Sequence, residues 1–201
     1  MTREDRRALG ALFSINLAGG TATPGSVAHR LGSGEGETES KLAKLARSGQ
    51  LRSAGGAYKL TPSGRESIRV VFIGGGFEVI HSGHLYTIEK ARSLGDVLVV
   101  AVATDDTIRK RKRREPVSTQ DERAKLLSSL RQVDVAIVGS EKDIYETLEK
   151  VKPDIVALGY DQYHAETDIL KEAKERGIRL KVVRLDSPEP GLKTSTILSA
   201  Y

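Results

Sequence analysis

The chain has 201 residues, of which 38% are hydrophobic and 29% charged, a balance typical of a folded globular protein. It contains no apolar run near the ~18 residues that a membrane span needs and no apolar stretch typical of a signal peptide, so we expect a cytoplasmic protein. The absence of cysteine excludes disulfides, cysteine nucleophiles and thiolate metal sites.

The net charge of +5 is unevenly distributed along the chain. Residues 1–67 carry a net +4, and residues 68–201 carry a net +1. The second part contains six consecutive basic residues at 109–114, without which its net charge is −5. These counts indicate a mildly basic N-terminal segment and one basic loop on an acidic body, which is not the pattern of a uniformly basic nucleic-acid-binding protein.

The first 67 residues favour helices followed by a hairpin. We expect a helix around Leu9 and Leu12, a second from Pro24 to Gly32, and a third over 38–47. Two short strands, 50–52 and 58–60, flank a glycine-rich turn at 54–56. Thr61 and Pro62 are typical of the first positions of a final helix.

This N-terminal segment resembles a winged helix, including its ending Tyr-x-Leu-Thr-Pro-x-Gly-Arg. In a DNA-binding member the third helix would enter the major groove with Lys41, Lys44 and Arg47. Glutamates at 35, 37 and 39 stand at the entrance of the same helix and would repel phosphates. DNA binding and a purely packing or dimerising function therefore both remain open.

Residues 68–201 alternate short apolar runs with helical stretches. The runs are 68–73, 97–103, 133–138, 155–158 and 178–183, and the helical stretches are 85–94, 120–130, 144–151 and 167–176. This alternation predicts an α/β fold with a doubly wound parallel sheet and helices on both faces. Ligands in such sheets bind at the carboxyl ends of the strands.

A glycine-rich loop with two histidines follows the first of these runs. Gly75, Gly76 and Gly83 lie close to His81 and His84, immediately before a helix. Backbone N–H groups at a helix N-terminus bind phosphate, and imidazoles can donate further hydrogen bonds to it. A lone glycine-rich loop is weak evidence, and a zinc site is an alternative with little support, because no cysteine is available. The spacing fits neither the dinucleotide-binding motif nor the P-loop.

Five motifs in order resemble the cytidylyltransferase-like nucleotidyltransferases. The stretch 75–84, Gly-Gly-Phe-Glu-x-x-His-x-Gly-His, is similar to the family's Gly-x-Phe-Asp-x-x-His-x-Gly-His. The others are Lys-x-Lys at 110–112, Gln-Asp-Glu-Arg at 120–123, Gly-Tyr-Asp-Gln at 159–162 and Lys-Thr-Ser-Thr-Ile at 193–197. The resemblance implies an enzyme that joins a nucleoside triphosphate to a phosphorylated acceptor and releases pyrophosphate.

The resemblance also implies functions for individual residues. The expected catalytic residues are His81, His84, Lys110 and Lys112. The expected nucleotide-binding residues are Gly75, Gly76, Phe77, Gly83, Arg123, Gly159, Asp161, Thr194 and Ser195. Among them, Arg123, Thr194 and Ser195 would hold the β- and γ-phosphates, and a Mg²⁺ ion would bridge the phosphates. No metal site made by the protein is expected, and the other four residues of the basic run are expected to be solvated.

Two positions depart from the family pattern. Glu78 replaces the aspartate of the first motif and is longer by one methylene, and Lys193 begins the last motif, where a small hydroxyl residue is usual. Neither change removes an expected phosphate ligand, but the group that Glu78 orients must be reached differently.

Within the family, the stretch 152–162 resembles the archaeal FAD synthetases most closely. This resemblance implies ATP and FMN as substrates, and homodimers are common in the family. A CTP-dependent cytidylyltransferase acting on glycerol-3-phosphate, ethanolamine phosphate or a similar small phosphate is the alternative. A nucleotide- or flavin-sensing winged-helix regulator is a hypothesis of another class, disfavoured because a sensor need not retain both histidines.

Overall fold

The computed structural model describes residues 1–187, 194 and 197. The chain divides into two compact units, Met1–Arg69 and Val70–Tyr201, and each is described by itself. No helix in the described part of the chain is long and apolar enough to cross a membrane.

The N-terminal unit contains three helices, a hairpin and a short fourth helix. The helices are α1 (Arg3–Leu17), α2 (Pro24–Leu31), α3 (Glu35–Arg47) and α4 (Pro62–Glu66), and the hairpin strands are β1 (Leu51–Ala54) and β2 (Ala57–Leu60). Thr2, Thr23 and Thr61 cap α1, α2 and α4 through their side chains. The element order matches the order expected from the sequence, and the assignment as a winged helix remains a prediction.

The turn of this hairpin is shorter than expected. Ala54 pairs with Ala57 at the end of the ladder, so only Gly55 and Gly56 connect the strands. Both glycines have positive φ, 59° and 76°, as two-residue hairpin turns of type I′ require. Ala54 therefore belongs to β1 and not to the turn predicted at 54–56.

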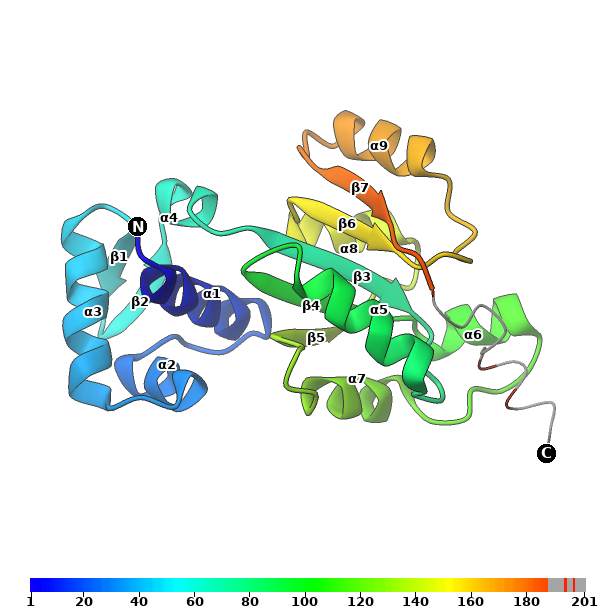
Figure 1. Ribbon diagram of the computed structural model, residues 1–201, viewed down its shortest axis with the longest axis horizontal. Coiled ribbons are helices and arrows are strands. Elements are labelled where there is room, and N and C mark those ends of the chain that lie inside the picture. Colours follow the sequence, from blue (N-terminus) through cyan, green and yellow to red (C-terminus); the bar gives the residue numbers. More distant parts are fainter. Residues whose placement is uncertain (188–193, 195–196, 198–201) are drawn as a thin grey trace. The chain divides into compact units, whose positions relative to one another are not determined.

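The second unit is built on a five-stranded parallel sheet (Figure 1). Its strands are β3 (Val70–Gly75), β4 (Val97–Val102), β5 (Val135–Val138), β6 (Ile155–Leu158) and β7 (Lys181–Arg184), in the order β5-β4-β3-β6-β7. All six residues of β4 are buried, as expected for a parallel strand with both faces covered. The predicted α/β fold with a parallel sheet is confirmed.

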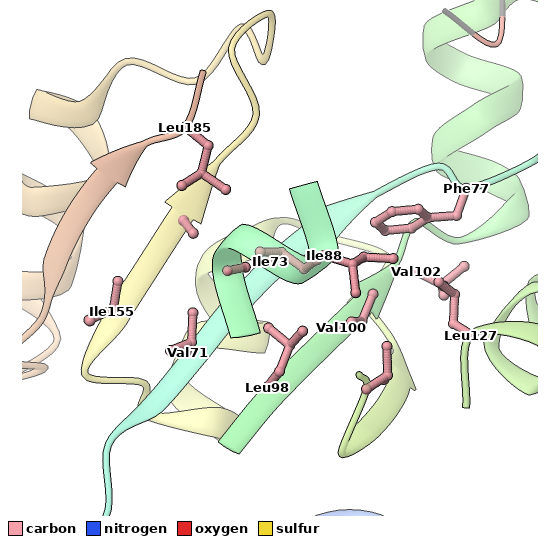
Figure 2. Packing of buried hydrophobic residues seen from close by; sticks show 13 residues of the cluster. Val71, Ile73, Phe77, Ile88, Leu98, Val100, Val102, Leu127, Ile155 and Leu185 are labelled. Carbon is pink, nitrogen blue, oxygen red and sulfur yellow. The ribbon is translucent and has the colours of Figure 1, made fainter. Parts of the chain in front are cut away.

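Within residues 70–187, five helices connect and cover these strands: α5 (Ser82–Arg92), α6 (Asp105–Lys112), α7 (Gln120–Ser128), α8 (Ile144–Val151) and α9 (Glu166–Glu175). On one face of the sheet, Ile88 of α5 and Leu127 of α7 pack into a cluster with Val71 and Ile73 of β3 (Figure 2). On the other face, Ile144 of α8 lies beside the position of Gly74. The alternation of side chains along β3 thus separates two apolar layers.

Helix α6 corrects one sequence-based expectation. The charge pattern predicts a loop for the basic run, yet its first four residues form the last turn of α6. Thr104 caps the helix, Asp105 and Asp106 occupy its first turn, and the basic residues lie at its C-terminus. This charge order complements the helix dipole and stabilises a short helix whose sequence has a weak apolar pattern.

The strand order places a switch point at β3. The chain moves from β3 outward to β4 and β5 on one side, and to β6 and β7 on the other. The loops that follow β3 and β6 therefore diverge at the carboxyl edge of the sheet and leave space between them, where ligands of such sheets bind.

Gly64 provides a test of packing in the N-terminal unit. A Cβ atom built on Gly64 would lie 2.0 Å from the Gln50 carbonyl oxygen and 3.1 Å from Leu60 Cδ2. We expect Gly64→Ala to lower the free energy of unfolding by about 2 kcal/mol, because the backbone must shift to relieve the overlap. Hydrogen exchange of amides in residues 1–69 measures this loss.

Gly36→Ala is the matched control, since Gly36 lies inside α3 and a Cβ atom placed on it would have no neighbouring atom within 4 Å. Alanine there should stabilise the helix by up to about 1 kcal/mol. Equal exchange rates in the two variants would contradict the packing described for Gly64.

Candidate active site

Two adjoining cavities lie at the carboxyl edge of the sheet. The smaller, of about 270 Å³, lies on the α5 side of β3, and the larger, of about 500 Å³, lies on the α6 and α8 side. Five residues line both cavities: Gly74, Gly75, Lys112, Asp161 and Gln162. Two ligands bound side by side would therefore meet at Lys112 and Asp161.

The smaller cavity brings together the histidine pair and the start of α5. His81 is the N-cap of α5 and makes no side-chain capping bond, and Gly83 and His84 follow in the first turn. The two imidazole rings lie 4.0 Å apart, centroid to centroid, and both line the cavity. A helix N-terminus with two imidazoles beside it is suited to bind an anion.

Both histidines have a buried ring nitrogen without a partner. The Nδ1 atoms of His81 and His84 make no hydrogen bond to any described residue. Burial lowers the pKa of both imidazoles, and in His84 burial and the neighbouring His81 bring the pKa to about 4. Both rings are therefore neutral at neutral pH. Buried polar atoms without partners cost about 1–3 kcal/mol, a cost that a phosphate ligand would offset.

Phe77 shapes the loop between β3 and the histidines. It has a φ of 49°, which is unusual for a residue other than glycine, and its ring lies 5.2 Å from the His84 ring. A Cβ atom on Gly75 would come within 2.9 Å of the Phe77 ring. A side chain at position 75 would therefore overlap the buried Phe77 ring, which also contacts the ring of His84.

Glu78 anchors the basic run. Its side chain is fully buried and accepts hydrogen bonds from Lys112 Nζ and, at 2.7 Å, from Arg114 Nη1. The Val117 backbone N–H also donates to it, at 3.3 Å. Burial opposes ionisation of this carboxyl, but hydrogen bonds from the two cations outweigh it and hold its pKa at about 2. Glu78 therefore stays charged and keeps Lys112 at the border of the two cavities.

Arg123 does not reach the cavities, contrary to the prediction that it holds phosphates. It is 1% exposed, and all three of its side-chain nitrogens donate to protein oxygens. The acceptors are the carbonyls of Gly76, Ala103 and Ser118 and the carboxylate of Asp105. Arg123 therefore ties the loop after β3 to the loop after β4 and to the start of α6.

The loop after β6 is also fixed by two side chains, those of Gln162 and Arg184. Gln162 Nε2 donates to the Gly74 carbonyl at 2.5 Å, and its Oε1 accepts from the Gly159 backbone N–H. Arg184 of β7 donates to the carbonyls of Gly159 and Gln162 and, at 2.9 Å, to that of His164. These contacts hold Asp161 between the two cavities. The Gly-Tyr-Asp-Gln motif contained the signal for Gln162, whereas nothing in the sequence pointed to Arg184.

The remaining predicted residues divide between the cavities. Lys110 and Gly76 line the larger cavity, and Gly159, Gly83 and Thr194 line the smaller. Thr194 Oγ1 lies 3.5 Å from the Val79 carbonyl. Ser195 and Lys193 lie outside the described residues. Within residues 1–187, 194 and 197, no three histidine or carboxylate side chains gather where they could hold a metal ion.

Comparison with known proteins gives a consistent match for this unit. The cytidylyltransferase-like family profile matches residues 72–200. The FAD synthase of Thermococcus onnurineus is 44% identical over 137 residues, which are 67% of this chain and 91% of that protein. The FAD synthase of Methanosarcina mazei is 40% identical over 140 residues, 68% of this chain and 91% of that protein.

Solved structures resemble the same region. A lipopolysaccharide core biosynthesis protein from Thermoplasma volcanium superimposes with a TM-score of 0.58 at 38% identity, covering 60% of this chain and 98% of that chain. A protein of unknown function from Archaeoglobus fulgidus gives a TM-score of 0.50 at 23% identity over 61% of this chain and 93% of its own, a likeness of fold alone.

The anchoring by Glu78 can be tested by removing its charge. We expect Glu78→Gln to lower the free energy of unfolding by about 2 kcal/mol at neutral pH, because bonds to two cations are weakened. The wild-type pKa is lowered from 4.5 to about 2, so this stabilisation is present above pH 4.5 and is lost as the pH falls toward 2. Denaturant unfolding between pH 7 and pH 2 measures the difference, which should vanish at the acid end.

Glu78→Asp is the control, because it keeps the charge and shortens the side chain by one methylene. Limited trypsin digestion after residues 109–114 should be fastest in Glu78→Gln and intermediate in Glu78→Asp. If all three proteins are cleaved at one rate, Glu78 does not anchor the basic run.

The lowered pKa of His84 predicts proton uptake when an anion binds. A triphosphate beside the ring stabilises the imidazolium form, so its pKa rises from about 4 and the complex holds more protons than the unliganded protein. Triphosphate affinity should therefore increase as the pH falls from 7 toward 5.5. Calorimetric titrations in two buffers of different ionisation enthalpy should detect up to about one proton taken up. His84→Asn should take up less, and equal uptake by both proteins would contradict this electrostatic coupling.

Proposed function

The chain belongs to the cytidylyltransferase-like family, and we propose that it is an FAD synthase, which transfers the adenylyl group of ATP to the phosphate of FMN and releases pyrophosphate. Eight relatives named FAD synthase, at 39–47% identity, support this function. The structural observation that carries it is the junction of the two cavities at Lys112, with the histidine pair on one side.

The reaction needs two anions held in line. An oxygen of the FMN phosphate attacks the α-phosphorus of ATP, a new P–O bond forms, and the bond from the α-phosphorus to the bridging oxygen of pyrophosphate breaks. Catalysis then consists of positioning the anions and stabilising the charge on the transferring phosphoryl group. No covalent intermediate with the protein is required.

The histidines and the start of α5 bind the triphosphate in this proposal. His81 and His84 donate hydrogen bonds to phosphate oxygens, the triphosphate favours the imidazolium form of His84, and the N-terminal dipole of α5 favours the negative charge. Thr194 lines the same cavity and adds a hydroxyl donor. Because both histidine rings have a buried nitrogen, hydrogen bonds to them act more strongly than they would in solution.

Lys112 acts at the border. Its ammonium group donates to Glu78 and would lie 3.7 Å from a Cβ atom placed on Gly76, and the side chain lines both cavities. From this position it interacts with the α-phosphate and with the acceptor phosphate. Glu78 keeps the lysine oriented before the substrates bind, which reduces the reorganisation needed in the transition state.

A divalent cation, Mg²⁺ in our proposal, enters with ATP. Among the described residues that line the smaller cavity, Asp161 is the one carboxylate. A single carboxylate suits an ion held mainly by phosphate oxygens and water, as Mg²⁺ commonly is. Asp161 would orient that complex.

Turnover of substrate pairs tests the proposed function. The full chain should form FAD and pyrophosphate from ATP and FMN in the presence of Mg²⁺. CTP with glycerol-3-phosphate or ethanolamine phosphate should give little product. Detection of pyrophosphate, together with chromatography of FAD, measures each pair. Pyrophosphate from a CTP pair alone would identify a cytidylyltransferase, and no product from any pair would contradict an enzymatic function.

The same assay tests the site. His84→Ala and Lys112→Ala should each lower kcat by about 10²-fold or more, because each removes a donor to the transferring phosphates. His29→Ala and Lys181→Ala are matched controls on exposed positions outside both cavities and should retain wild-type rates.

A further inference from the structure

The larger cavity is wider than a small phosphate acceptor requires, and the part of its lining formed by the strands is apolar. Its volume of about 500 Å³ is in the range of pockets that enclose whole organic ligands, roughly 300–1,000 Å³. Neighbouring strands provide apolar residues to its lining: Phe72, Ala101, Val156 and Leu158. Burying a flat apolar ring against this lining is favourable, whereas a small hydroxylated phosphate would leave it exposed to water.

We call the apolar part of the lining, Phe72, Ala101, Val156 and Leu158, the floor of the cavity. Gly74 leaves the space above this floor open. A Cβ atom built on Gly74 would lie 3.6 Å from Phe72 Cε1 and 3.8 Å from Ile144 Cδ1, so a side chain here would extend over the floor. These are ordinary contact distances, and the backbone of Gly74 does not require glycine for its conformation. Glycine is unfavourable inside a strand unless something approaches closely. Its presence in β3 therefore points to a ligand above position 74.

An aromatic side chain stands at the edge of the same cavity. Tyr163 is 65% exposed, unusual for so large an aromatic group, and its ring lies 4.0 Å from that of His164. The guanidinium of Arg111, on α6, lies 4.3 Å from the centroid of the Tyr163 ring, a cation–π contact. A fixed, exposed ring beside an apolar cavity is suited to stack on a planar ligand.

Two lysines contribute positive charge to the larger cavity, and one of them lies where this cavity adjoins the smaller one and the acceptor phosphate must meet the triphosphate. Lys110 and Lys112 line the larger cavity, and Lys112 also lines the smaller one. A ligand whose ring lies on the floor near Gly74 can thus extend its phosphate toward Lys112 and the histidine pair. The two ends of the cavity match the two parts of a flavin mononucleotide, a tricyclic ring and a phosphate.

We propose that the larger cavity binds the tricyclic ring of the flavin acceptor, and that Gly74 and Tyr163 determine its acceptance. This inference rests on the proposed function and adds to it the location of the ring and the residues that select it. Gly74 provides room over the floor, Tyr163 stacks on the ring from the edge, and Lys112 binds the phosphate.

Two variants and two flavins test this assignment. In Gly74→Val the side chain fills the floor while suiting a strand, and Tyr163→Ala removes an exposed ring with little effect on the fold. Flavin fluorescence titrations measure binding of FMN and of riboflavin, which has the ring and lacks the phosphate. Steady-state kinetics measure KM separately for FMN and for ATP. Gly36→Val, on an open helix position, is the control.

We expect Gly74→Val to raise the Kd and KM for FMN by about tenfold or more and to weaken riboflavin binding similarly, with KM for ATP changed by less than about twofold. Tyr163→Ala should raise the FMN values by roughly fivefold or more, through lost stacking. Unchanged flavin binding in both variants would overturn the assignment, as would a selective rise in KM for ATP, which would place the adenine ring in this cavity.

Measurements on the wild-type protein distinguish failure of the cavity assignment from failure of the proposed function. If it forms FAD but both variants bind flavin normally, the proposed function stands and the ring is bound elsewhere. If it neither binds FMN nor forms FAD, the proposed function itself fails, and the assignment of the cavity fails with it.

Discussion

At the end of β3 the fully buried carboxylate of Glu78 accepts hydrogen bonds from Lys112 and Arg114. A charge in this position is tolerated only when it is paired, because its desolvation costs several kcal/mol. Because Lys112 and Arg114 must reach Glu78, α6 and the residues after it run across the carboxyl ends of the strands. Arg123 stabilises the same region through hydrogen bonds to the Gly76 carbonyl and the Asp105 carboxylate. The position of the basic residues relative to the histidine pair follows from these two buried networks.

Most of the fold could be predicted from apolar patterning. The helix at 144–151 and the strand at 155–158 have the predicted bounds, and the parallel sheet follows from strands without polar alternation. Helix α6 escapes prediction because six consecutive cations conceal its weak apolar pattern, with Ile108 as its one buried residue. The relevant signals are the Thr104 cap and the acidic first turn, which act through the helix dipole and not through periodicity.

The site could be predicted where its residues are close in sequence. The histidine pair, its glycines and Phe77 form one continuous loop, so their spacing fixes their proximity. Arg123 lies near the start of a helix, where a basic residue is a candidate for binding an anion. Its side chain instead donates hydrogen bonds to carbonyls from three separate loops. Arg184 could not be recognised for the same reason, because three of its four acceptors are backbone carbonyls, which leave no trace in the sequence.

The function of each residue in the basic run depends on the group that it contacts. Arg109 pairs with Asp106 and Glu115, and Arg114 is committed to Glu78. Lys110, Arg111 and Lys112 line the larger cavity, with Arg111 against the ring of Tyr163. The last turn of α6 projects the side chains at 109–112 in different directions, so neighbouring cations serve either the fold or a ligand. Neither a solvated loop nor a uniform phosphate-binding patch describes them. The arrangement neutralises part of the charge within the protein and presents the rest at the cavities, where two anionic substrates must approach each other despite their mutual repulsion.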